Sequence, residues 1–148
     1  MILLDTNVLV RMTDSDDLQC SVVRGTIHLL SARRERIAIV PQNLFEFWAV
    51  ATRKIGPPPA GQNGLGLTAN QASQWLRFFQ RRFTLLHDKE DLISLWHDLV
   101  RGSGILGNKS HDVRLVAAMQ SHGIARLCTF NTDHFRNFPI TLLDPASL

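Results

Sequence analysis

The sequence predicts an α/β fold in which a central, mainly parallel sheet is flanked by helices. Short apolar segments alternate with longer amphipathic segments along the chain, as in proteins built from successive strand–helix units. Of the 148 residues, 45% are hydrophobic and 20% are charged, which suits one globular unit with a buried core. We therefore expect a single domain over residues 1–148.

The predicted strands are short runs of apolar or β-branched residues bounded by polar ones. They cover residues 2–5, 36–40, 84–86, 126–130 and 140–143.

The predicted helices carry apolar residues at helical spacing. Thr68 is a suitable N-cap, Ser110 precedes the last of these helices, and Gly123 follows its end. Between them, the stretch GPPPAGQNGLG at 56–66 predicts a long loop. The helices cover residues 18–33, 42–54, 68–83, 88–100 and 111–122.

The net charge of +3 and the sequence pI of about 9.4 weakly favour a polyanionic partner. No apolar run approaches the ~20 residues of a membrane helix, and no basic leader precedes the apolar start. These features predict a cytoplasmic protein that does not enter the membrane. Cys20 and Cys128 have no partners at zinc-ligand spacing, so we expect two buried free thiols.

Four acidic residues follow strands or begin the helices after them. Asp5 ends the first strand, Glu46 lies in the helix after the second strand, and Asp112 opens the helix near residue 111. Asp133 follows the strand that ends near Phe130. Because parallel strands end at one edge of a sheet, the four carboxylates are expected at the same edge.

Structural roles are open for three of these residues. Asp5 could cap a helix that starts at Thr6, Asp112 could complement a helix dipole, and Asp133 could begin a turn. Glu46 is different, because apolar residues surround it in LFEFWAVA. A carboxylate in such surroundings indicates a function.

Carboxylates that converge in one cleft raise each other's pKa values unless a cation neutralises them. Oxygen ligands without cysteine or histidine suit Mg²⁺ or Mn²⁺, and a bound ion of this kind supports phosphodiester hydrolysis. Arg53 lies seven residues after Glu46, on about the same helix face, whereas Arg114 lies two after Asp112, on another face. Both are candidates for contacts to RNA phosphates.

Four segments resemble the PIN domain family in their order and spacing. They are LLDTNVLV, PQNLFEFWAVATR, HDVRLVAAM and LCTFNTDHF, and together they span nearly the whole chain. Within this family, the chain is most similar to the VapC-type ribonuclease toxins of prokaryotic toxin–antitoxin pairs. The resemblance implies a three-layer sandwich, Mg²⁺-dependent endoribonuclease activity, a homodimer and inhibition by a cognate antitoxin.

The resemblance also assigns the site residues. It places Asp5 and Asp112 as the metal-binding aspartates and Glu46 as the acidic residue that completes the site. Three further side chains correspond to polar residues that orient the first aspartate or line the same cleft: Thr6, Asn7 and Thr129.

The last acidic position of the family varies, and this sequence offers two candidates for it. Asp133 can bear a charge and is the preferred prediction. Asn131 is the alternative, in which case Asp133 lies outside the site.

The helices at 68–83 and 88–100 carry large apolar side chains that could pack internally, form a homodimer or receive an antitoxin segment. These side chains are Trp75, Phe78, Phe79, Leu92, Leu95 and Trp96.

Two other functions are weighed against the nuclease. A PIN-fold module that binds RNA without cleaving it is the main alternative, although the acidic set is complete. An aspartyl phosphatase is disfavoured, because Asn7 stands where such an enzyme needs a second aspartate.

Overall fold

The computed structural model describes residues 1–15, 17–56 and 64–148. Five strands form one sheet in the order β3-β2-β1-β4-β5, and each neighbouring pair is parallel. The prediction of a parallel sheet flanked by helices is confirmed. The strands are β1 (Ile2–Leu4), β2 (Ile37–Ile39), β3 (Thr84–Leu85), β4 (Arg126–Cys128) and β5 (Thr141–Leu143).

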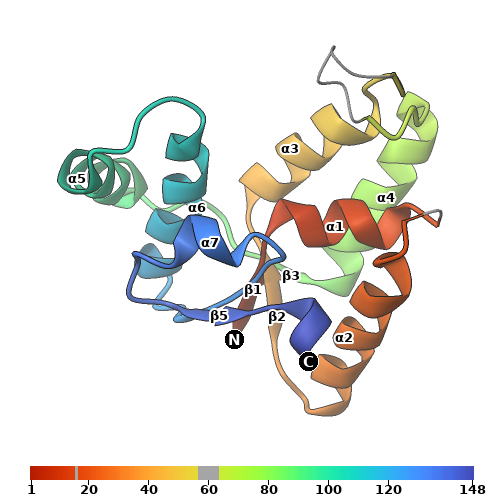
Figure 1. Ribbon diagram of the computed structural model, residues 1–148, viewed down its shortest axis with the longest axis horizontal. Helices are drawn as coiled ribbons and strands as arrows, with labels where there is room; N and C mark the ends of the chain where they lie inside the picture. The colour runs from red at the N-terminus through yellow and green to blue at the C-terminus, as the bar shows by residue number, and fades with distance from the viewer. Residues whose placement is uncertain (16, 57–63) are drawn as a thin grey trace.

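Helices cover both faces of this sheet. In Figure 1, α1 to α4 lie on one side of the strands and α5 to α7 on the other. A short 3-10 helix, Pro145–Ser147, ends the chain beside α2. The helices are α1 (Thr6–Thr13), α2 (Cys20–Ala32), α3 (Pro41–Ala51), α4 (Ala69–Arg82), α5 (Leu92–Ser103), α6 (Lys109–Ser121) and α7 (Thr132–Phe135).

Alternate residues of the central strands enter two separate cores. In β1, Ile2 and Leu4 pack against α1 to α4, whereas Leu3 packs against α5 and α6. In β2, Ile39 packs into the first of these cores and Ala38 into the second. A strand that is buried on both faces needs apolar residues at every position, which is why these strands are continuous apolar runs.

Several boundaries differ from the predicted ones. The helix predicted over 88–100 is α5, which runs from Leu92 to Ser103. The last long helix begins at Lys109, so Ser110 lies inside it and is not its cap. The prediction contained α1 only as an alternative and did not contain α7. Residues 57–63 of the predicted loop lie outside the described residues.

Of the four aromatic residues proposed for an interface, Phe79 is buried, Trp75 and Trp96 are half-buried and Phe78 is exposed. Phe79 is fully buried and contacts Phe47 edge to face, with 4.9 Å between ring centroids. Trp96 donates a hydrogen bond to the Ser110 carbonyl and joins α5 to α6. Phe78 remains the exposed member of α4.

Both cysteines are free and buried, as predicted. Burial raises the pKa of the Cys128 thiol to about 12, so this thiol stays protonated. In the part of the chain that the structure describes, no helix is both long and apolar enough to cross a bilayer.

Candidate active site

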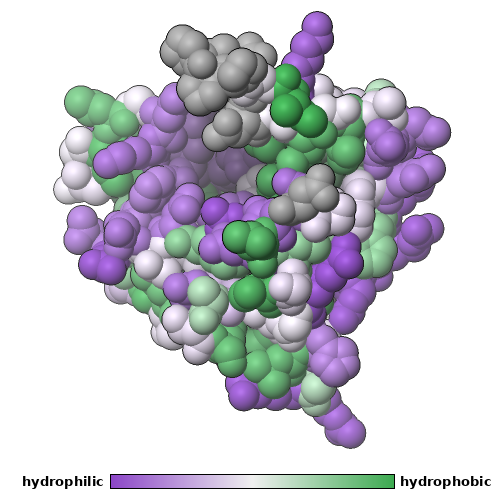
Figure 2. Space-filling model, turned by 45° about the vertical axis from the view of Figure 1, so that its right-hand side comes forward, coloured by the Kyte–Doolittle hydropathy of each residue, from purple (hydrophilic) through white to green (hydrophobic). Residues whose placement is uncertain are grey.

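A cavity of about 600 Å³ opens at the carboxyl end of β1, between α1, α3 and α6. Figure 2 shows a hollow with mostly hydrophilic walls in the upper half of the molecule. Ligands of parallel α/β sheets bind at this edge. The cavity brings three of the four predicted acidic residues together. It is lined by Asp5, Thr6, Asn7, Val10, Arg11, Asp14, Asp17, Glu46, Ala49, Val50, Arg53, Leu65, Asp112 and Asn131.

Asp5 links the ends of two neighbouring strands. It stands in the N-cap position of α1, but its side chain reaches across to β4. Its Oδ2 accepts hydrogen bonds from Asn7 Nδ2 at 2.8 Å and from the Thr129 hydroxyl at 2.6 Å. Asn7 also donates to Thr129 Oγ1, at 3.1 Å. The three side chains form a closed triangle that fixes the Asp5 carboxylate at the cavity wall.

The surroundings of Asp5 disfavour its negative charge. Its pKa is raised from 3.8 to about 6, chiefly because burial removes water from the carboxylate. The hydrogen bond from Thr129 lowers the pKa, while the charges of Asp112 and Glu46 raise it. The site therefore concentrates negative charge in a poorly hydrated place, where a bound cation would be stabilised.

Glu46 is held by hydroxyl and amide donors. Its Oε2 accepts a hydrogen bond from Thr6 Oγ1 at 2.6 Å, and its Oε1 accepts one from Gln42 Nε2 at 2.7 Å. Thr6 Oγ1 in turn accepts from the buried amide of Asn43, which also donates to the Leu4 carbonyl. Neither of these two donors to Glu46 is a cationic side chain.

Asp112 enters the cavity from the other side of the sheet. It lies in the first turn of α6, where the helix dipole favours a carboxylate. Its Oδ2 is 3.0 Å from Nδ1 of His134 on α7. The dipole interaction and the exposure to the cavity are compatible, so the structural role does not exclude a catalytic one.

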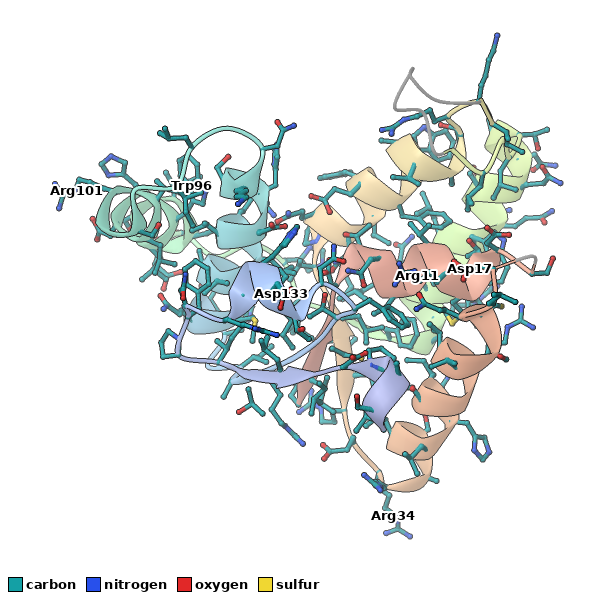
Figure 3. The ribbon with its side chains drawn as sticks, in the orientation of Figure 1. Arg11, Asp17, Arg34, Trp96, Arg101 and Asp133 are labelled. Atoms are coloured by element: carbon teal, nitrogen blue, oxygen red, sulfur yellow. The ribbon has the colours of Figure 1, made fainter. Side chains whose placement is uncertain are left out.

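The structure separates Asn131 from Asp133. Asn131 precedes α7 and lines the cavity, and its N–H donates to Thr129 Oγ1 at 3.0 Å. The side chain of Asp133 is 76% exposed and pairs with Arg136 at 2.7 Å. Asp133 lines a neighbouring depression, on the segment labelled in Figure 3. Asp133 therefore does not line the cavity itself, but it shares the neighbouring depression with Asp112. The reason is local: α7 begins at Thr132, and each helical residue turns about 100° from the one before.

The donor chemistry fits a hard divalent ion. Mg²⁺ prefers oxygen ligands and retains several waters, so one or two carboxylates can hold it. Within residues 1–15, 17–56 and 64–148, no three acidic, histidine or cysteine groups are close enough to surround one ion. Asp5 and Asp112 face one cavity and could supply the two carboxylates.

Two arginines line the cavity and a third does not. Arg53 lines the cavity with Glu46, although α3 ends at Ala51 and not at residue 54, so Arg53 reaches the cavity from the segment after the helix and not by helical spacing. The guanidinium of Arg11 lies over the Phe130 ring, 4.2 Å from its centroid. Arg114 donates to Gln42 Oε1 at 2.8 Å and pairs with Asp88 at 2.6 Å. Because its guanidinium already binds these two side chains, Arg114 is a weaker candidate than Arg53 for a contact to RNA phosphates.

Four polar residues around the site did not emerge from the sequence. Arg11 follows Asp5 by six residues, and only the formation of α1 brings it to the cavity. The other three, Gln42, Asn43 and His134, have hydrogen-bond partners that are distant along the chain. The one available indication was the polar pair Gln42 and Asn43 beside Pro41, at the start of an otherwise apolar helix.

Solved structures share this fold at low sequence identity. VapBC2 from Rickettsia felis, bound to a promoter DNA fragment, is 21% identical over 97% of this chain and 98% of that one, with a TM-score of 0.68. FitAcB from Neisseria gonorrhoeae is 17% identical over all of both chains, with a TM-score of 0.69. VapC20 from Mycobacterium tuberculosis, a Sarcin-Ricin loop cleaving toxin, is 17% identical over 92% of this chain and 94% of that one, with a TM-score of 0.64.

No curated protein matches the chain by sequence. The family model of the PIN domain, in contrast, matches residues 2–140, which include β1, α3, α6 and the segment after β4. All the cavity-lining residues described above fall within this match. The chain belongs to the PIN domain family.

Proposed function

We propose that this protein is an Mg²⁺-dependent endoribonuclease and the toxin of a VapBC-type toxin–antitoxin pair. The observation that carries the proposal is the meeting of Asp5, Glu46 and Asp112 around one cavity at the carboxyl edge of a PIN-domain sheet. The likeness to VapBC complexes and to a toxin that cleaves the Sarcin-Ricin loop supports the substrate class.

The carboxylates of the cavity and the side chains that hold Asp5 have separate roles in this chemistry. Asp5 and Asp112 would hold the ion from opposite faces of the sheet, and Asn7 and Thr129 keep Asp5 in place. A bound Mg²⁺ would make its water a better nucleophile and would stabilise charge on the phosphate. Glu46 retains free lone pairs toward the cavity with which it could orient that water. Hydrolysis by water leaves the ribose 2′-hydroxyl unused, so the products would carry 5′-phosphate and 3′-hydroxyl ends.

A panel of fluorescent RNAs tests the proposal directly. We expect cleavage in the presence of Mg²⁺ or Mn²⁺ and none in EDTA. A PIN-fold module that only binds RNA would bind these RNAs but leave them intact both with the metal ion and in EDTA. That result would contradict the proposed nuclease activity.

Arg53 is the strongest candidate for a contact to RNA phosphates. Replacing it with alanine is expected to weaken RNA binding by a similar factor for every sequence, because phosphates carry no base information. The slope of log affinity against log salt should become shallower by about 1. The measurement uses Asp112→Asn protein, so that the RNA is not consumed.

Arg101→Ala is the matched control for this prediction. Arg101 lies on α5, at the outer left of Figure 3, far from Arg11 and Asp17 at the cavity. If Arg53→Ala leaves the salt slope at the wild-type value, the RNA path lies elsewhere, with the exposed arginines Arg77, Arg81 and Arg82 next to be tested.

A groove lined mainly by α2 and α4 suits the proposed antitoxin partner. It has a volume of about 560 Å³, and its lining includes the apolar residues Ile27, Trp75 and Phe78 together with Arg24 and Arg82. We propose that an antitoxin segment with apolar and acidic side chains binds there. Several structures of the same fold were solved as toxin–antitoxin complexes, which supports a partner of this kind.

We also propose a homodimer, located in the cytoplasm. Sedimentation of the chain at micromolar concentration, alone and after coexpression with a small protein encoded next to it, where the genome has one, tests both assemblies. A mass of 16.7 kDa under all conditions would contradict them.

A further inference from the structure

The strongest unassigned feature near the cavity is a chain of hydrogen bonds that runs from α6 to Glu46. Gln42 stands at its centre, in the first turn of α3, and is only 7% exposed. Its Nε2 donates to Glu46 Oε1 at 2.7 Å and to the His111 carbonyl at 2.9 Å. Its Oε1 accepts from Arg114 Nη1 at 2.8 Å. The nitrogen and the oxygen of this side-chain amide are therefore both engaged inside the protein.

The partners leave only one orientation for the Gln42 amide. A guanidinium can only donate hydrogen bonds, so the amide oxygen must face Arg114. An ionised carboxylate can only accept, so the amide nitrogen must face Glu46. Arg114 is fixed in its turn, because its Nη2 lies 2.6 Å from Asp88 Oδ2.

The same amide connects the two walls of the cavity. Gln42 and Glu46 are one helical turn apart on α3, which packs on one face of the sheet. His111 and Arg114 lie on α6, which packs on the other face (Figure 1). Asp112 directly follows His111 in the chain. A clamp on the His111 carbonyl and the Arg114 guanidinium therefore sets the position of Glu46 relative to Asp112.

We propose that Gln42, oriented by Arg114, is a positioning residue that holds Glu46 at a fixed distance from Asp112. The inference rests on the proposed function, since it concerns the same carboxylates. It also explains why a neutral amide separates Arg114 from Glu46. A guanidinium in direct contact with Glu46 would neutralise the carboxylate and compete with a bound cation, whereas the amide orients the carboxylate and leaves its charge available.

A double-mutant cycle on Mn²⁺ binding tests the proposal. Gln42→Met keeps the approximate length of the side chain and removes its hydrogen bonds. We expect it to weaken Mn²⁺ binding about tenfold or more, because Glu46 is proposed to orient a water of the ion from outside the ligand pair Asp5 and Asp112, and the loss of such outer contacts lowers metal affinity to this extent. In the Glu46→Gln background the same substitution should have little further effect, because Gln42 acts through Glu46. Calorimetry measures the affinity, and RNA cleavage provides a second readout.

Gln120→Met is the matched control, because Gln120 is exposed on the last turns of α6. Arg114→Met is the second variant, and it keeps the proposal testable if Gln42→Met does not fold by circular dichroism. It should also weaken Mn²⁺ binding, and again only when Glu46 is present.

The outcomes separate the inference from the proposed function. If wild type binds Mn²⁺ and cleaves RNA, but the effects of Gln42→Met and Glu46→Gln are additive, Gln42 is a general structural residue and the inference is overturned. Unchanged Mn²⁺ affinity in folded Gln42→Met protein overturns it as well. A wild type that neither binds Mn²⁺ nor cleaves RNA instead contradicts the proposed function, and the inference with it.

Discussion

Asp112→Asn is expected to lower the rate of Mg²⁺-dependent RNA cleavage by about three orders of magnitude. The substitution keeps the size of the side chain and removes one of the two carboxylates proposed to hold the ion. The electrostatic contribution of a catalytic metal is worth several kcal/mol, and each 1.36 kcal/mol corresponds to about tenfold in rate. The fold should persist, because Asp112 contacts the side chain of His134 at the surface and does not contribute to the apolar core.

Two other aspartate variants sharpen this measurement. Asp98→Asn changes an exposed carboxylate on α5 and should cleave RNA at the wild-type rate. Asp133→Asn should resemble Asp98→Asn, because Asp133 is paired with Arg136 outside the cavity. A strong loss in Asp133→Asn would show that α7 rearranges to bring this carboxylate into the site. Cleavage that survives both EDTA and Asp112→Asn would point to a different set of residues.

Local patterns in the sequence indicated where three of the candidate site residues lie. Asp5 lies at the end of a buried strand, and parallel strands end at one edge, so its location follows from the fold class. Glu46 could be recognised because a carboxylate interrupts an apolar helix. The position of Asp112 could be expected because it lies at the start of a helix that packs on the same sheet. These patterns indicated position only: capping or dipole roles stayed open for Asp5 and Asp112, and their assignment as metal ligands came from the resemblance to the PIN domain family.

The sequence could not predict contacts that depend on the packing of helices. Gln42 and Arg114 are 72 residues apart, and nothing local to either indicates the other. Arg114 was therefore predicted as an RNA ligand, although the structure gives it two internal partners. The choice between Asn131 and Asp133 was uncertain for a different reason: the four-residue helix α7 has too little periodicity to predict, yet its first residue decides that Asn131 lines the cavity and Asp133 the neighbouring depression.

Asp5→Asn should stabilise the metal-free protein at neutral pH. The pKa of the Asp5 carboxyl is about 6 in the folded protein, against 3.8 for an unperturbed aspartate. Between these values the folded state binds more protons than the unfolded state, so the free energy of unfolding falls as the pH rises through this window. Above it, the wild type keeps an ionised carboxylate in a poorly hydrated site, at a cost of up to roughly 3 kcal/mol. Asparagine has no such charge.

Thermal unfolding in EDTA measures this difference. At pH 7.5 we expect the Tm of Asp5→Asn to exceed that of wild type by on the order of 5 °C, since 1 kcal/mol shifts Tm by about 2–4 °C in a chain of this length. At pH 4 the wild-type carboxyl is largely protonated, and the two values should converge. Asp98→Asn serves as the control and should follow the wild type at both pH values.

Saturating Mg²⁺ should reverse the order of the two Tm values at pH 7.5, so that wild type unfolds at a higher temperature than Asp5→Asn. An ion that binds only the folded state raises the free energy of unfolding in proportion to the logarithm of its concentration over its Kd. The wild type has the Asp5 carboxylate and gains this stabilisation, whereas Asp5→Asn lacks it and gains little. The charge that destabilises the metal-free site is thus the charge that binds the ion. If Asp5→Asn were less stable than wild type in EDTA, and gained as much from Mg²⁺, Asp5 would be a structural cap of α1 and the metal site would lie elsewhere in the cavity.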